Sequence, residues 1–281
     1  MRIAVTGATG FLGRHVVPAL AAHGAQVTAM VRPGSEPKLW IAGLESVVID
    51  IASAADSDFE SLGCPDVVVH LAWQGLPNYR SLHHFETELP VQYRFLKSLV
   101  VGGLKRLVVT GTCFEYGMQS GALAETLPTK PANPYGFAKD TLRRKLEYLK
   151  AKNPFALVWA RLFYMYGEGQ AANSLLPQLE RAIASGDAVF NMSGGEQLRD
   201  YLSVTAIADC LARLAIGDAD PGLINICAGK PVSVRALVEG WITERSASIA
   251  LNRGHYPYPD YEPMAFWGDR KKLDTTLAAS A

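Results

Sequence analysis

The sequence predicts an α/β fold built on a doubly wound parallel sheet, and two observations support this prediction. Short apolar segments rich in β-branched residues alternate with helical patterns, which is the order expected of βαβ units. A glycine-rich segment, Thr6–Gly13, follows the first expected strand and leads directly into the first expected helix. The chain has 281 residues, which is enough for one large α/β domain or for two lobes.

The expected elements follow from this alternation. The expected strands are Arg2–Val5, Gln26–Val31, Val47–Asp50, Val67–Leu71, Leu107–Thr110 and Ala156–Leu162. The apolar periodicity predicts helices at Leu12–His23, Glu86–Val101 and Phe137–Ala151. After Gly167 the alternation loosens, and helices are expected near Ser174–Ser185, Thr205–Ile216 and Val234–Arg245. We therefore expect the sheet within residues 1–165 and a smaller C-terminal lobe within 166–281, with some segments returning to the sheet.

The glycine-rich segment predicts a Rossmann-type nucleotide site. Gly7, Gly10 and Gly13 have the spacing Gly-x-x-Gly-x-x-Gly at a strand-to-helix turn. The first glycine permits the tight bend, the second lets a diphosphate approach the main chain, and the third lets the helix pack closely. The start of the helix can then bind phosphate through its N–H groups. The predicted cofactor contacts in this turn are Gly7, Thr9, Gly10, Phe11, Leu12 and Gly13.

Arg32 favours NADP(H) over NAD(H). A site for NAD usually places an Asp or Glu against the ribose 2′-hydroxyl after the second strand, but the segment Val31–Ser35 contains no acid. Arg32 could instead bind the 2′-phosphate of NADP(H), with help from Ser35. The alternative interpretation is an ordinary exposed arginine.

Tyr135 and Lys139 form a Tyr-x-x-x-Lys pattern near the start of an expected helix. Residues four apart share a helix face, so both side chains should point into one cleft. Hydride transfer at a carbinol carbon needs a proton donor or acceptor at its oxygen. A phenol serves poorly at neutral pH unless a nearby cation lowers its pKa, and we expect Lys139 to supply that cation and to contact the nicotinamide ribose. The alternative is a surface pair without function.

The bulk composition narrows the class of protein. Lys plus Arg and Asp plus Glu both number 27, so the net charge is +0, and neither nucleic acid nor an anionic membrane is an expected partner. The four cysteines are scattered, which favours reduced thiols over a disulfide framework or a metal site. No signal peptide or membrane-spanning run is recognisable, and we expect a cytoplasmic protein.

The chain resembles the extended short-chain dehydrogenase/reductase family over nearly its whole length. The resemblance depends on the glycine spacing of Gly7–Gly13, on Val69–Ala72, on Tyr135–Lys139, on Arg161–Gly167 and on Arg199–Val204. Members of this family act largely on nucleotide sugars. The resemblance therefore implies a nucleotide-sugar substrate, and a homodimer formed through the helices expected at Glu86–Val101 and Phe137–Ala151.

The resemblance also implies roles for individual residues. Thr112, five residues before Gly117, matches the catalytic Ser or Thr that hydrogen-bonds the substrate oxygen; its alternative role is a cap at a strand end. The implied catalytic residues are thus Thr112, Tyr135 and Lys139. The adenine would meet Asp50 and Ile51, and the central part of the cofactor Leu71 and Ala72. The implied substrate-binding residues are Thr112, Cys113, Phe114, Tyr135, Asn173 and Arg199.

The resemblance carries further expectations for two of the substrate-binding residues and for two other positions. Arg199 matches an arginine that binds the substrate diphosphate, and its alternative is a salt-bridged structural residue. Asn173 would also cap the following helix. Two positions depart from the family pattern: Tyr164 stands where an Asn usually contacts the substrate, and Ala206 where an Asp usually packs the lobes together.

The residues beside Thr112 restrict the reaction. Dehydratases of the family carry Asp-Glu after the catalytic Thr, whereas this chain has Cys113 and Phe114. Members that epimerise and reduce carry a Cys two positions after the catalytic residue and a partner His, but here no His lies between His84 and His255. Of the reactions known in the family, oxidation or reduction at a single carbon therefore remains. With Arg32, this favours a reductase of NDP-4-keto-6-deoxyhexoses, which the chain resembles.

Two other functions stay open. One is an NAD-dependent nucleotide-sugar 4-epimerase, and the other is a non-catalytic NADP(H) sensor. The sequence leaves open the nucleotide base and the configuration produced at C4. The tail 255–269, rich in Tyr, Pro and Trp, would suit closure over a sugar or base, or would form a strap packed on the smaller lobe.

Overall fold

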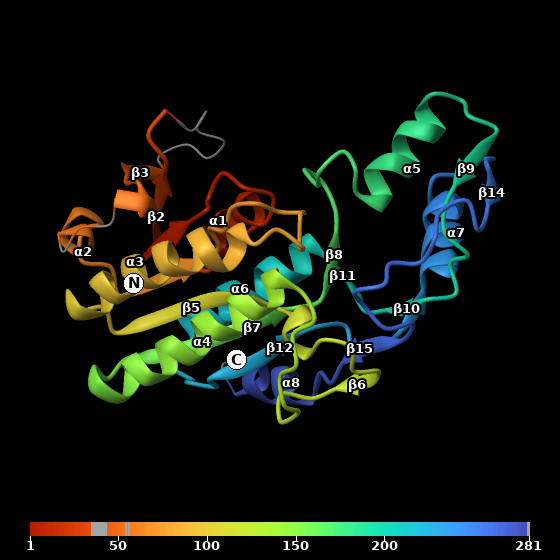
Figure 1. Cartoon of the computed structure of the whole chain (residues 1–281). Helices are drawn as coiled ribbons and strands as arrows, with labels where there is room; N and C mark the ends of the chain where they lie inside the picture. Colours follow the sequence, from red (N-terminus) through yellow and green to blue (C-terminus); the bar gives the residue numbers. More distant parts are fainter. Residues whose placement is uncertain (35–43, 54, 56, 280–281) are drawn as a thin grey trace.

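A seven-stranded parallel sheet forms the centre of the computed structural model, which describes residues 1–34, 44–53, 55 and 57–279 (Figure 1). Across the sheet the strands run in the order β12-β7-β5-β4-β1-β2-β3. Their bounds are β1 (Arg2–Thr6), β2 (Gln26–Val31), β3 (Glu45–Val48), β4 (Val67–His70), β5 (Arg106–Thr112), β7 (Ala156–Leu162) and β12 (Leu223–Ile226). The order reverses between β1 and β4, which defines a doubly wound sheet and confirms the predicted fold class.

Helices cover both faces of the sheet and bury two apolar cores. One face packs against α1 (Gly13–Ala22), α6 (Val204–Ile216) and α8 (Lys271–Ala278). The other face packs against α3 (Leu89–Val101) and α4 (Pro134–Lys152), with the short α2 (Asp58–Ser61) at its margin. Both faces of β1, β4 and β5 are therefore buried, which explains why their sequences are continuous apolar runs.

Two elements have other bounds than expected. The third strand is Glu45–Val48 in place of Val47–Asp50. Asp50 instead accepts hydrogen bonds from Ala52 N (3.0 Å) and Ser53 Oγ (3.2 Å) at the 3-10 turn Ile51–Ser53. The helix expected from Glu86 begins as a π-helical turn, His84–Glu88, before α3 continues it. The strand β12 and the helix α8 were not among the expected elements.

A smaller part of the molecule lies beside the sheet, on the right in Figure 1, and has its own core around Leu179, Phe190, Val238 and Trp241. Its helices are α5 (Leu175–Ala184) and α7 (Val234–Glu244). Its paired strands are β9 (Val189–Asn191) with β14 (Ala250–Asn252), and β10 (Leu198–Arg199) with β13 (Val232–Ser233). Two further pairs join it to the sheet region: β8 (Tyr164–Tyr166) with β11 (Tyr201–Ser203), and β6 (Gly121–Leu123) with β15 (Phe266–Gly268).

The segments after residue 166 alternate between these two parts. The chain builds α5 and β9 in the smaller part, returns to the sheet with α6 and β12, and ends on the sheet with α8. Among the described residues, no helix combines the length and apolar character needed to cross a membrane.

Candidate active site

The glycine turn after β1 leaves bare backbone where the fold needs it. Gly7 has a φ of 67°, and its O accepts a hydrogen bond from Gly10 N at 3.0 Å. A Cβ at Gly13 would lie 2.2 Å from Gly7 O and 2.5 Å from Ala8 O, so no larger residue fits there. Phe11 and the start of α1 follow directly. The turn therefore has the shape of a diphosphate cradle.

The ends of β1 and β4 are tied together beside this turn. Thr6 Oγ1 accepts hydrogen bonds from Leu71 N (3.1 Å) and Ala72 N (3.2 Å), and bonds His70 Nδ1 at 2.9 Å. Ala72 N would lie 2.9 Å from a Cβ on Gly7. The structure therefore brings Leu71 and Ala72 against the glycine turn, where a cofactor would extend.

The residues expected at the adenosine end lie at the edge of the described chain. Arg32 is exposed after β2 and makes no hydrogen bond or ion pair with the residues that the structure describes. Asp50 is exposed and caps its own turn, while Ile51 is buried. Ser35, the expected helper of Arg32, lies outside the described residues. Within the described part of the chain, nothing therefore engages the guanidinium of Arg32.

Thr112 ends β5 and begins a 3-10 turn, Cys113–Tyr116. Thr112 Oγ1 accepts a hydrogen bond from Phe114 N at 3.3 Å, and Glu115 Oε1 accepts one from Thr112 N at 2.9 Å. This reciprocal pair is a capping box. Thr112 therefore caps the turn, and this bond fixes its hydroxyl at the carboxyl end of the sheet.

Tyr135 and Lys139 lie in the first turns of α4. Asn133 caps that helix, because its side chain accepts a hydrogen bond from Gly136 N at 2.8 Å. The two predicted side chains share the buried face of the helix. Lys139 Nζ donates to Thr110 O at 3.0 Å and lies 5.9 Å from the centroid of the Tyr135 ring. The structure thus brings these residues to the end of β5.

Thr112, Tyr135 and Lys139 therefore meet, but the electrostatics of the pair differ from the expectation. Burial raises the pKa of Tyr135 and outweighs a hydrogen bond with Thr112, which lowers it. Burial also lowers the pKa of Lys139 from 10.5 to about 7. The phenol stays protonated at neutral pH, as an unperturbed phenol also would. Burial shifts its pKa in the opposite direction to the lowering expected from Lys139.

Aromatic residues surround Tyr135, and sequence reasoning missed most of them. Ring centroids of His84, Tyr79 and Trp73 lie 5.2, 5.6 and 6.0 Å from that of Tyr135. Lys139 Nζ lies 4.0 Å from the centroid of the Trp73 ring, a cation–π contact. Trp73 directly follows the predicted cofactor residue Ala72, and this position after β4 was a signal for it. Tyr79 and His84 gave no comparable signal.

A buried carboxylate, Glu115, holds the backbone of Thr112 through a hydrogen bond. Besides Thr112 N, it accepts hydrogen bonds from Trp159 Nε1 (2.9 Å) and from Arg161 Nε (2.7 Å). Glu115 and Arg161 are both fully buried. Their ion pair therefore fixes the backbone of the turn that carries the predicted catalytic hydroxyl.

The structure places two expected substrate residues in unexpected surroundings. Arg199 is 2% exposed; it pairs with Glu262 at 3.1 Å and donates to Met264 O at 3.2 Å. Its guanidinium is thus engaged by residues of the tail. Asn173 is exposed, but the N-cap of α5 is Ser174, so the expectation that Asn173 caps this helix is wrong.

The remaining expected substrate residues lie close to Tyr135. Phe114 is buried, with its ring centroid 6.4 Å from that of Tyr135. Cys113 is buried next to it, and burial raises the pKa of its thiol, which stays neutral. Tyr164, one of the departures from the family pattern, hydrogen-bonds Glu262 through its hydroxyl. The described residues contain no group of His, Cys, Asp and Glu that could hold a metal ion.

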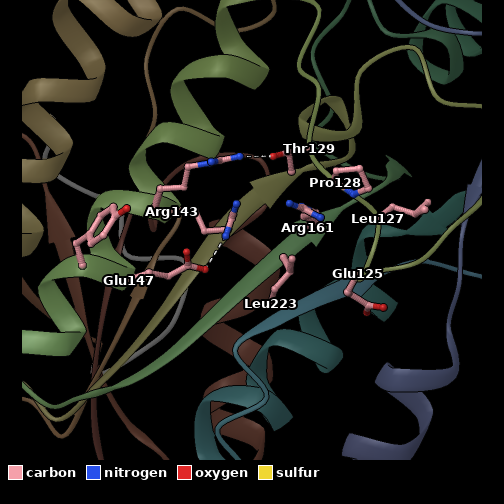
Figure 2. Close-up of a pocket in the computed structure, with 10 residues that line it drawn as sticks. Glu125, Leu127, Pro128, Thr129, Arg143, Glu147, Arg161 and Leu223 are labelled. Carbon is pink, nitrogen blue, oxygen red and sulfur yellow. Dashed lines mark hydrogen bonds and ion pairs between the residues drawn. The ribbon is translucent and has the colours of Figure 1, made fainter.

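A separate hollow of about 530 Å³ lies between α4 and the edge of the sheet (Figure 2). Arg161, Thr129 and Leu223 line it, together with Arg143, whose Nη1 binds Glu147 at 2.6 Å. None of the residues that line it is a predicted catalytic, cofactor or substrate residue. Glu115 holds Arg161 between this hollow and Thr112, so the hollow lies behind the catalytic turn.

The chain is similar to known proteins over most of its length. The pattern of the NAD dependent epimerase/dehydratase family matches residues 3–227. The dTDP-6-deoxy-L-talose 4-dehydrogenase (NAD(+)) of Aggregatibacter actinomycetemcomitans is 31% identical over 270 residues, which cover 95% of this chain and 99% of that protein. The GDP-6-deoxy-D-talose 4-dehydrogenase of the same organism is 27% identical over 287 residues, covering 99% and 91%.

Solved structures are similar to the chain as well. The structure of MoeE5 in complex with UDP-glucose and NAD is 27% identical, covers 99% of this chain and 92% of that one, and superposes with a TM-score of 0.84. The fold and site therefore define an extended short-chain dehydrogenase/reductase, as the sequence predicted. The chain belongs to the NAD dependent epimerase/dehydratase family.

Proposed function

We propose that this protein catalyses the NADPH-dependent reduction of the C4 ketone of a nucleotide-linked 4-keto-6-deoxyhexose. The observation that carries the proposal is the meeting of Thr112, Tyr135 and Lys139 at the end of β5, beside the glycine turn. The narrow turn at Gly13, which a Cβ would fill, fits a dinucleotide. When bound, NADPH supplies the hydride.

The chain's own residues supply the proton and hold the substrate. Tyr135, whose buried phenol stays protonated at neutral pH, gives its proton to the oxygen that forms at C4. Thr112 donates a hydrogen bond to the same oxygen. Glu115 holds Thr112 in position by accepting a hydrogen bond from Thr112 N. Lys139 binds the ribose of the cofactor, and its ammonium is positioned by the Trp73 ring and by a hydrogen bond to Thr110 O.

The relatives support the choice of substrate. Three of them are named for oxidation at C4 of a nucleotide-linked 6-deoxytalose. Oxidation of that alcohol and reduction of its 4-ketone are the same reaction in opposite directions, so one site serves both. Arg32 supports NADP(H), because an exposed guanidinium after β2 can form charge-assisted bonds to a 2′-phosphate. A relative from Kitasatospora kifunensis is named for NAD(P)(+).

The test is the substitution Tyr135→Phe, with Tyr148→Phe on the exposed side of the same helix as the matched control. Each protein is incubated with NADPH and a panel of dTDP-, CDP- and GDP-4-keto-6-deoxyhexoses. We expect Tyr135→Phe to lower turnover by about 10²- to 10⁴-fold, the usual contribution of a general acid, with the affinity for NADPH unchanged. Turnover at the parent rate would exclude Tyr135 as the acid.

A 4-epimerase is the second candidate. The UDP-glucose 4-epimerase of Halalkalibacterium halodurans is 25% identical over 265 residues, which cover 85% of this chain. An epimerase retains NAD and recycles its hydride. Purified protein that carries bound NAD and interconverts UDP-sugars without added cofactor, while leaving every 4-keto sugar unreduced, would replace the reductase by the epimerase.

A further inference from the structure

Residues 255–265 lie between β14 and β15 and cross from the smaller part of the molecule to the catalytic residues. We call this segment the strap. At its start, His255 N donates to Met192 O at 3.0 Å. Near its end, Met264 O accepts a hydrogen bond from Leu198 N at 2.8 Å. Both ends of the strap are therefore tied to the smaller part, and its middle is held in a defined place.

The middle of the strap delivers one aromatic ring to the catalytic residues. The centroid of Tyr261 lies 6.0 Å from that of Phe114 and 6.1 Å from that of Tyr79. Those two rings lie 4.9 Å from each other. Each also contacts the ring of Tyr135, at 6.4 Å from Phe114 and 5.6 Å from Tyr79. Tyr261, Tyr79 and Phe114 thus form a continuous aromatic wall beside the proton donor.

Ion pairs on either side of Tyr261 fix this wall. Asp260 pairs with Arg80, whose guanidinium carbon lies 5.5 Å from the centroid of the Tyr261 ring. Glu262 pairs with the buried Arg199 at 3.1 Å. The strap is therefore clamped at the residues directly before and after the ring, which orients that ring toward the other two.

We propose that the aromatic wall receives C6 of the sugar, so that the site selects a 6-deoxyhexose over the same sugar with a 6-hydroxyl or a 6-carboxylate. The inference rests on the proposed function, which places C4 at Tyr135. C6 is two bonds from C4, so side chains that touch Tyr135 meet the C6 substituent. The nucleotide base is separated from C4 by the sugar ring and the diphosphate, so it lies beyond this wall.

The chemistry of the wall suits a methyl group. Phe114 offers no hydrogen-bonding group, and the rings of Tyr79 and Tyr261 pack against it as apolar surface. A 6-hydroxyl buried against these rings would lose hydrogen bonds to water. Among the described residues, the two arginines beside the wall, Arg80 and Arg199, already pair with acidic residues of the strap, so neither is free to bind a 6-carboxylate.

The test measures selectivity at C6. The value of kcat/KM for oxidation at C4 is compared for dTDP-6-deoxy-L-talose and dTDP-L-talose, with NADP⁺ and with NAD⁺, in the parent and in Tyr261→Ser. Tyr261→Phe keeps the ring, and Tyr256→Ser is the matched control because Tyr256 is 50% exposed in the same strap. Inhibition by dTDP alone reports on the base and the diphosphate.

We expect the parent to prefer the 6-deoxy sugar by about 10- to 100-fold, which is the discrimination an apolar pocket achieves against an added hydroxyl. Tyr261→Ser should reduce this preference to about threefold or less, chiefly by losing activity on the 6-deoxy sugar. Tyr261→Phe and Tyr256→Ser should keep it, and inhibition by dTDP should be unchanged. If Tyr261→Ser does not fold, Arg80→Ala, which breaks the exposed ion pair with Asp260 beside Tyr261, should also lower the preference for the 6-deoxy sugar.

The outcomes separate this inference from the proposed function. The protein could turn over 4-keto-6-deoxy sugars while Tyr261→Ser and Arg80→Ala leave the preference for the 6-deoxy over the 6-hydroxy sugar unchanged. That result would refute the aromatic wall as the C6 site and leave the proposed reductase intact. Weaker inhibition by dTDP in Tyr261→Ser would place the Tyr261 ring against the base and would also refute the wall as the C6 site. A parent that processes no sugar at C4 would refute the proposed function and the wall together.

Discussion

Lys139 is a buried base whose replacement should stabilise the protein while it removes activity. Lys139→Met keeps the length of an unbranched side chain and removes the charge. Burial lowers the pKa of Lys139 from 10.5 to about 7. Between pH 10.5 and about 7, the unfolded chain therefore binds this proton to a greater extent than the folded chain does. Stability should fall as the pH falls from 10.5 to about 7, and the contribution of this group should be constant below that.

The size of the effect follows from the pKa shift. Each pH unit between the two pKa values changes the free energy of unfolding by about 1.4 kcal/mol. Between pH 9.5 and pH 7 the parent should lose about 3 kcal/mol through Lys139, a loss that Lys139→Met cannot suffer. The variant also loses the hydrogen bond to Thr110 O, at about 1 kcal/mol and independently of pH. The advantage of the variant should therefore grow by about 3 kcal/mol as the pH falls.

The assay is urea unfolding of both proteins at pH 7, 8 and 9.5, followed by tryptophan fluorescence and compared as differences so that other titrating groups cancel. Lys271→Met is the control, because the side chain of Lys271 is 92% exposed and its replacement should leave the pH dependence unchanged. Turnover of a 4-keto sugar should be lost in Lys139→Met alone. Parallel stability curves for parent and Lys139→Met would show that Lys139 keeps an ordinary pKa, and the reasoning from burial would be wrong.

Three other substitutions test the cofactor site and its support. Arg32→Ala should weaken NADPH by about ten- to a hundredfold and leave NADH nearly unchanged, from a charge-assisted bond of ~1.5–3 kcal/mol; equal losses in titrations of both cofactors would make Arg32 structural. Gly13→Ala, whose Cβ would lie 2.2 Å from Gly7 O, should abolish dinucleotide binding by calorimetry, and binding of parent strength would contradict the cradle. Glu115→Gln leaves Arg161 as an unpaired buried charge and should cost about 3–5 kcal/mol in urea unfolding; a loss below 1 kcal/mol would show that the pair is dispensable.

The features that local spacing determines could be predicted from the sequence. The alternation of apolar runs and helical patterns predicted the doubly wound sheet, and β2 and β7 have the predicted bounds. The glycine turn depends on conformations within seven residues. The pairing of Tyr135 with Lys139 depends only on the helical repeat, since residues four apart share a face. None of these features needs knowledge of a distant partner.

The tertiary structure alone decided the environment of these residues. Glu115 becomes the support of Thr112, and Tyr261 becomes a neighbour of Tyr79, only because the fold brings separated segments into contact. Arg199 pairs with Glu262, a residue of the tail that no local pattern connects to it.

The direction of the pKa shifts was decided in the same way. The sequence predicted that Lys139 would make the phenol of Tyr135 more acidic, whereas burial raises the pKa of that phenol and lowers that of Lys139. Spacing along a helix determines which side chains lie side by side. How far each is removed from water depends on everything that packs around it, and here that includes Trp73, Tyr79 and Phe114, which come from other parts of the chain.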